Sequence, residues 1–141
     1  MYTGDYDEHL PARWPVWPGY DPDFLLVKPT LDVLLQPHNA SLEFTFYQAD
    51  KFPAEYKGDI FASEHGSWNK ARRTGYNVVR VPMRGTRAAG DYEIFLSGFV
   101  TADGDVWGRP VGVAVARDGA LLVTDDASNS IWRISYPGAK R

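Results

Sequence analysis

The 141-residue sequence contains no cysteine, which excludes disulfide bonds and thiolate chemistry and leaves the redox compartment open. It lacks any apolar run near the length of about 18 residues that a membrane-spanning helix needs. Its first ten residues, MYTGDYDEHL, are polar and acidic, unlike a signal peptide. There is no excess of positive charge, because 15 basic and 18 acidic residues give a net charge of −3. Nucleic acid is therefore disfavoured as a partner.

Apolar and aromatic residues are plentiful, at 44% and 14% of the chain, which is enough to bury the core of one ordinary domain. The first 37 residues differ from the rest, because proline and aromatic residues alternate there without a helical or strand period. We interpret residues 1–37 as an extended connector and residues 38–141 as the folded part.

From Leu42 onward the sequence has the pattern of β-strands, with β-branched and aromatic runs bounded by turn residues. Asp118-Gly119 suits the positive backbone angles of a tight turn and predicts a hairpin there. The seven predicted strands are 42–47, 58–64, 75–83, 91–99, 111–116, 120–126 and 130–136.

The strand pattern repeats. VVRV at 78–81 returns as IWRI at 131–134, and GDIFASEH at 58–65 returns as GALLVTDD at 119–126. Three antiparallel strands that recur in the same order, with a fourth strand between the repeats, are typical of propeller blades. We therefore predict an all-β partial propeller, with about one complete four-stranded blade and three strands of the last blade. A small sandwich built from the same strands is the alternative. Two blades cannot close a ring, so we expect a fragment of a propeller.

Blade topology also predicts where a site would lie. The segment that enters the first strand of a blade and the loop that joins its second and third strands lie at the same end. Most side chains with useful chemistry fall in the four segments that converge there, which are residues 36–39, 64–75, 106–110 and 125–130.

Arg109 and His65 each have two interpretations. The Arg109 guanidinium suits a bidentate contact with a carboxylate ligand, or it pairs with Asp125 or Asp126 within the protein. His65 suits a general base or a cofactor contact, or it is a hydrogen-bonded structural residue.

Trp68 and Trp107 suit stacking on a planar cofactor or sugar, or plain packing between blades. Lys70 lies in a basic loop with Arg72 and Arg73, which suits either anion binding or simple solvation. The loop aspartates lack the spacing of an EF-hand, so no metal ligand is predicted.

Three segments carry a family resemblance: the HGSWN loop with its flanking strands, YEIFLSGF, and WGRPVGVAVARDGALLVTDDASNSIWRISY. Over about 37–136 the chain resembles the C-terminal part of the glucose/sorbosone dehydrogenase family, in particular its L-sorbosone dehydrogenase-like members. The resemblance implies part of a six-bladed propeller of a periplasmic or secreted quinoprotein. Such proteins oxidise a sugar hydroxyl or aldehyde by hydride transfer to pyrroloquinoline quinone (PQQ) held beside calcium.

The resemblance also implies a set of residues around the cofactor. In the glucose dehydrogenase branch two arginines of an R-x-R-D-V segment contact the surroundings of the quinone; here Arg109 matches the second and Trp107 stands at the first. A lysine of that branch comes from the loop where this chain has His65 and Lys70. The implied cofactor-binding residues are Arg109, His65, Trp68, Lys70 and Trp107. The catalytic base and calcium ligands of the family come from earlier blades, so none is assigned here.

The implied partners are a sugar substrate and an electron acceptor, with missing N-terminal blades or a second copy of the chain completing the propeller. We expect the isolated chain to be inactive. Two other functions fit the repeat: an interaction module of the NHL type, which DGALLVTDDASNSIWRI resembles, and a calcium-dependent sugar lactonase.

Overall fold

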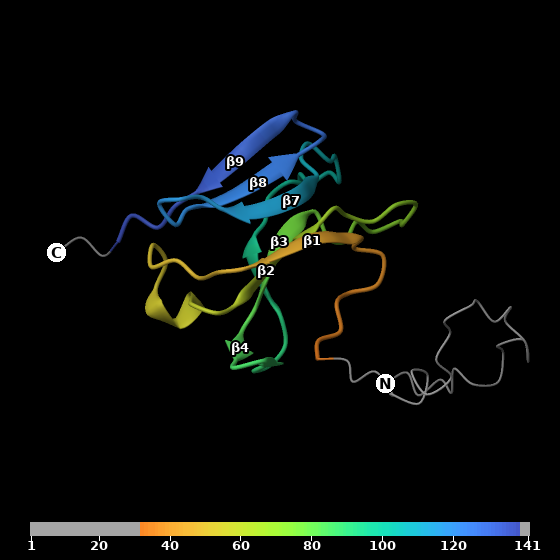
Figure 1. Ribbon diagram of the computed structural model, residues 1–141. Coiled ribbons are helices and arrows are strands. Elements are labelled where there is room, and N and C mark those ends of the chain that lie inside the picture. Colours follow the sequence, from red (N-terminus) through yellow and green to blue (C-terminus); the bar gives the residue numbers. More distant parts are fainter. Residues whose placement is uncertain (1–31, 139–141) are drawn as a thin grey trace, which may run out of the picture. The chain divides into compact units, whose positions relative to one another are not determined.

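The computed structural model describes residues 32–138, shown in colour in Figure 1. The described residues fall in one compact unit of the chain, residues 31–141. Most of the predicted connector, residues 1–37, lies outside them. Within residues 32–138 no helix is long and apolar enough to cross a membrane.

The described residues form antiparallel sheets and one short 3-10 helix, η2 (Ala54–Tyr56). The first sheet has the order β1-β2-β3-β6, with strands Ser41–Phe46, Ile60–Glu64, Asn77–Val81 and Glu93–Leu96. The second has the order β7-β8-β9, with strands Pro110–Val115, Leu121–Asp125 and Ser130–Ile134. The predicted all-β class and the grouping into four and three strands are confirmed.

The sequence prediction missed a small hairpin of β4 (Met83–Arg84) and β5 (Arg87–Ala88), which projects beyond the first sheet in Figure 1. It placed Met83 at the end of the preceding strand instead. Pro82 ends β3, because proline has no N–H to give to the ladder. Strands of two residues are too short to show an alternating pattern, so the hairpin has no signal of its own.

The sequence repeat is also a repeat of strand register. Each sheet has an irregular register near the start of its first strand and regular pairing of its next two strands. Equivalent pairs in the two sheets are Phe44↔Ala62 with Val113↔Val123, and Ile60↔Val81 with Leu121↔Ile134.

The two sheets pack against each other, with β7 beside β1 and β2 (Figure 1). Phe61 of β2 is fully buried between them and makes edge contacts with neighbouring aromatic rings. Burial of this apolar surface is the main force that holds the sheets together. The buried core consists of Tyr47, Phe52, Phe61, Val78, Val113, Leu121 and Val123.

Polar contacts join the sheets at both ends of this core. At one end the Tyr47 hydroxyl donates to the Gly119 carbonyl at 2.8 Å. At the other end the Ser63 hydroxyl donates to the Val111 carbonyl at 2.5 Å, and the Glu43 carboxylate accepts the Val113 N–H at 3.2 Å. We call the second set, Glu43 and Ser63 with β7, the polar seam.

Candidate functional site

The four segments predicted to converge do lie at one end of the two sheets, which we call the loop end. The Gly66 N–H donates to the Asn39 carbonyl at 2.8 Å, which joins the first two segments. The Asp126 N–H donates to the Arg109 carbonyl at 3.3 Å, which joins the other two. Side-chain contacts of His65 then connect the first sheet to the second.

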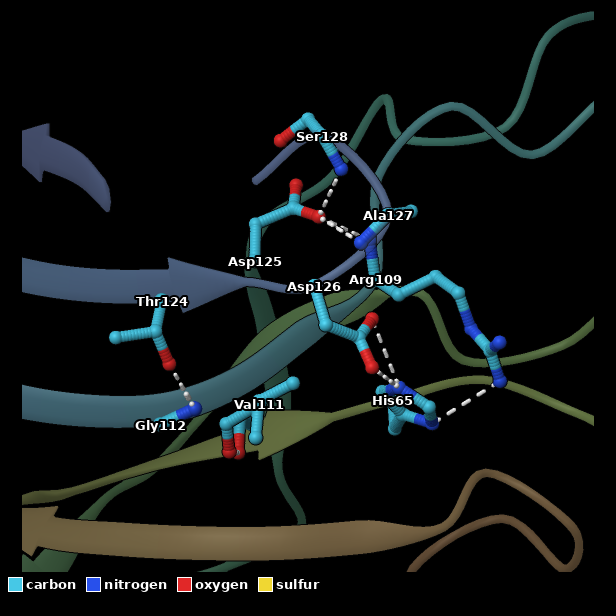
Figure 2. Close-up of polar contacts among 10 residues, drawn as sticks. His65, Arg109, Val111, Gly112, Thr124, Asp125, Asp126, Ala127 and Ser128 are labelled. Atoms are coloured by element: carbon cyan, nitrogen blue, oxygen red, sulfur yellow. Dashed lines mark hydrogen bonds and ion pairs between the residues drawn. The ribbon is translucent and has the colours of Figure 1, made fainter. Parts of the chain in front are cut away.

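His65 lies between Arg109 and Asp126, as Figure 2 shows. Its Nδ1 is 3.2 Å from Nη2 of Arg109, and its Nε2 is 3.1 Å from the Asp126 carboxylate. A guanidinium only donates hydrogen bonds, so Nδ1 accepts and the ring proton sits on Nε2, where it donates to Asp126. In this arrangement both ring nitrogens of His65 are engaged, and the ring positions the Arg109 guanidinium.

Asp125 organises the main chain of the second sheet. Its Oδ1 accepts N–H groups of Arg109 at 2.9 Å, Ala127 at 3.0 Å and Ser128 at 3.1 Å, and its Oδ2 accepts the Trp132 indole N–H at 2.9 Å (Figure 2 draws the Oδ1 contacts). Burial raises the pKa of Asp125, but hydrogen bonds from the Arg109 N–H, the Trp132 indole and Ser128 outweigh it and hold the pKa below its ordinary value. Asp125 thus binds the backbone of Arg109, while the guanidinium contacts His65.

A pocket of about 500 Å³ opens beside these contacts. Trp68 lies at the edge of this pocket and is 81% exposed. Nε of Arg109 is buried and has no hydrogen-bond partner within residues 32–138, so the guanidinium keeps an unused donor. The lining residues are Ser67, Trp68, Asn69, Arg73, Tyr76, Val106 and Arg109.

The HGSWN loop owes its shape to a glycine that no other residue can replace without strain. Gly66 has a φ of +109°, and a Cβ added there would lie 2.3 Å from the Tyr76 ring. The Tyr76 hydroxyl in turn donates to the Ser67 carbonyl at 2.6 Å, and the Ser67 N–H donates to the Thr74 carbonyl at 2.8 Å. These contacts close the loop on itself and leave Trp68 at its exposed tip.

The other two predicted contacts lie away from the pocket lining. Lys70 donates to the Thr74 hydroxyl at 3.2 Å, within its own loop. Trp107 donates its indole N–H to the Gly98 carbonyl at 2.9 Å, and its ring lies 5.2 Å from Phe99 and 5.8 Å from Trp132. The structure thus brings Arg109, His65 and Trp68 together and places Lys70 and Trp107 elsewhere.

Sequence reasoning did not single out Ser67, Tyr76 or Val106 as pocket residues. Tyr76 precedes β3 and reads as part of a strand, but its φ of +58° ends the loop and turns its ring toward Gly66. No short motif in the sequence marks such a residue.

Whether the loop end could hold a metal ion depends on the ligand side chains that are present there. Residues 32–138 contain no group of three or more His, Asp or Glu side chains that could hold one. Calcium in proteins is held by several oxygen ligands, usually including carboxylates. Residues 32–138 therefore contain no ligand set for the calcium that the family resemblance implies, and that resemblance places the calcium ligands in earlier blades.

Two packed antiparallel sheets with a pocket at one end define an all-β unit consistent with part of a β-propeller-like domain. Residues 26–137 match the TrAA12-like family, and the chain belongs to that family.

Three known proteins are similar to the chain. It is 41% identical over 103 residues to an uncharacterized protein of Borreliella burgdorferi, covering 72% of this chain and 27% of that protein. It is 32% identical over 130 residues to a PQQ-dependent pyranose dehydrogenase of Coprinopsis cinerea, and the match covers 77% of this chain and 16% of that enzyme. The solved holo PQQ domain of pyranose dehydrogenase from Coprinopsis cinerea superposes with a TM-score of 0.58 at 27% identity, covering 74% of this chain and 29% of that one.

The chain thus spans only a minor part of the length of these relatives, 27% and 16% for the two curated ones. The predicted resemblance to PQQ-dependent sugar dehydrogenases is confirmed at that level, because one relative is a pyranose dehydrogenase that uses PQQ. Assignment to the sorbosone dehydrogenases remains a prediction.

Proposed function

We propose that the chain forms part of a PQQ-dependent sugar dehydrogenase domain and supplies one wall of its cofactor site. Membership of the TrAA12-like family and the similarity to a PQQ domain support this proposal. Support from the chain's own residues comes from the pocket at the loop end.

The pocket fits the chemistry of this cofactor. PQQ is a planar quinone that carries carboxylate groups, and it would need cations and an aromatic face. Arg109 and Arg73 supply positive charge, and Trp68 supplies an exposed ring. The observation that carries the proposal is the place of Arg109 on the pocket wall, where His65 lies 3.2 Å from its Nη2 and where its planar guanidinium suits a bidentate carboxylate contact.

Each residue then has a defined role. Arg109 binds a cofactor carboxylate, His65 fixes the orientation of the guanidinium, and Trp68 covers the ring. When bound, the quinone supplies an acceptor for a hydride from the sugar. His65 does not act as a free base, because both of its ring nitrogens are engaged. Lys70 and Trp107 would contribute only at the margin of the site.

The rest of the proposal follows from the resemblance alone. The substrate is a sugar hydroxyl or aldehyde, with an aldose or sorbosone as its source, and the electrons pass to a separate acceptor. The full protein works in the periplasm or outside the cell. A catalytic base would come from residues beyond those described.

A neighbouring blade is part of the same proposal. Val113 of the second sheet is 3% exposed because it packs on the first sheet, whereas Phe44, its equivalent in the first sheet, is 61% exposed. Leu42 and Phe46 on the same face of β1 are 53% and 47% exposed. Because the two sheets repeat one pattern, we propose that another blade of a six-bladed ring covers this face, from a longer chain or from a second copy.

The test is a titration of the full chain with PQQ, in which binding is measured by the quenching of tryptophan fluorescence. Arg109→Gln removes a charged hydrogen-bond partner worth about 1.5–3 kcal/mol, so affinity should fall roughly ten- to a hundredfold. Arg117→Gln is the matched control, because Arg117 is exposed beside the Asp118-Gly119 turn at the opposite end and should leave affinity unchanged. Equal affinity of wild type and Arg109→Gln, or no saturable binding by the folded wild type, contradicts the proposal.

A further inference from the structure

A second polar cluster lies at the loop end of the first sheet, where three residues face one another across β1, β2 and β3. Ser41 pairs with Glu64, and Glu64 pairs with Asn77. Directly opposed residues of neighbouring antiparallel strands project to the same face. The Ser41 hydroxyl donates to Oε1 of Glu64, which confirms that these two side chains meet.

Asn39 joins this cluster through Gly75. The Asn77 amide donates to the Gly75 carbonyl at 3.4 Å. The side-chain Cγ of Asn39 lies 3.2 Å from the place where a Cβ on Gly75 would be, so Asn39 lies against the same glycine. The four side chains of Asn39, Ser41, Glu64 and Asn77 therefore gather at one corner of the sheet.

Three oxygen atoms of this cluster are buried without a hydrogen-bond partner: Oδ1 of Asn39, Oε2 of Glu64 and Oδ1 of Asn77. The residues themselves are 5%, 0% and 7% exposed. Within residues 32–138 no lysine, arginine or histidine forms a salt bridge with Glu64. A buried carboxylate oxygen without a partner is strongly unfavourable, so this corner suits an electropositive group.

All three unpartnered atoms are acceptors, which decides the nature of that group. A water molecule has two protons and would leave one of the three oxygens unpaired. A hard cation is a partner that several acceptor oxygens can share, and carboxylate, amide and hydroxyl oxygens are its preferred ligands. Glu64 supplies the single negative charge, so one positive charge makes the corner neutral.

We propose that Asn39, Ser41, Glu64 and Asn77 form a binding site for a monovalent cation, Na⁺ or K⁺. The site is separate from the pocket that Arg109 lines, and it does not depend on the proposed use of PQQ. Glu64 directly precedes His65, and the Asn39 carbonyl holds the Gly66 N–H. The ion therefore supports the base of the HGSWN loop.

The experiment is thermal unfolding of the full chain in NaCl, KCl and choline chloride at one ionic strength, which keeps general screening constant. A cation that binds only the folded state raises the midpoint, by about 5 °C at a concentration tenfold above its Kd. Glu64→Gln should abolish the difference between Na⁺ or K⁺ and choline. Glu55→Gln, which removes an exposed carboxylate of the same type, should keep it.

Sodium-23 relaxation of the wild-type protein gives a second readout that does not require a folded variant. Excess relaxation that KCl displaces and choline chloride does not supports the site. Equal midpoints in all three salts, with no excess relaxation, overturn it and assign the corner to buried water. A midpoint that rises only with CaCl₂ or MgCl₂ overturns the choice of a monovalent ion.

Discussion

Replacement of Asp125 tests the reasoning about the second sheet most directly. Asp125→Ala removes four hydrogen bonds at once and leaves their donors behind. The N–H groups of Ala127 and Ser128 lie at a turn and regain water, so the main loss comes from the Arg109 N–H and the Trp132 indole. At about 1–3 kcal/mol for each buried donor left unpaired, we expect a loss of roughly 3 kcal/mol.

The assay is urea unfolding of the variant and the wild type. With an m-value of about 2 kcal/mol/M, the loss corresponds to a midpoint lower by about 1.5 M. Asp126→Ala is the neighbouring control, because its carboxylate is 56% exposed and, within residues 32–138, pairs only with His65. This substitution should cost under about 1 kcal/mol. A fall of less than about 0.3 M for Asp125→Ala would refute the assignment of Asp125 as the residue that organises this sheet.

The same residue predicts a pH dependence. Because the folded state lowers the pKa of Asp125, its ionised form stabilises the protein above the unfolded pKa of about 3.9. This stability is lost as pH falls through the lower folded pKa. The stability difference between wild type and Asp125→Asn should therefore shrink on acidification from pH 5, and a difference that stays constant argues against the pKa shift.

Two further changes test the packing of the sheets and of the loop by the same urea assay. Tyr47→Phe removes the hydroxyl that donates to the Gly119 carbonyl and accepts two backbone N–H groups, so it should lower the free energy of unfolding by about 2 kcal/mol. An unchanged urea midpoint would show that this contact does not hold the sheets together. Gly66 and Gly58 both have a positive φ, and a residue with a Cβ in that conformation loses about 1–2 kcal/mol of stability, so Gly66→Ala and Gly58→Ala should both destabilise the fold. Only the Gly66 variant also meets the Tyr76 ring, so it should lose clearly more stability, and equal losses would contradict the close approach.

Much of the fold was predictable because strand signals here are local. Alternation of apolar and polar residues, with turn residues between, located seven strands, and the repeat grouped them correctly. The β4–β5 hairpin was not predictable, since it depends on a turn at Gly85 between strands of two residues each.

For the site, the sequence predicted which loops converge but not which residues contact one another. Blade geometry brought the right loops together, but it did not give the partners within them. His65 meets Asp126 from a position 61 residues away, and this contact depends on how the sheets pack. Trp107 lies beside Arg109 in sequence, yet packing with Phe99 and Trp132 draws it out of the pocket.

The polar seam has a consequence for this site. The Val111 carbonyl and the Val113 N–H of β7 bind Ser63 and Glu43 of the first sheet, so a slide of one sheet along the other would break both contacts. The seam therefore fixes the position of one sheet along the other. The 3.2 Å contact between His65 of one sheet and Arg109 of the other is the distance that this setting delivers.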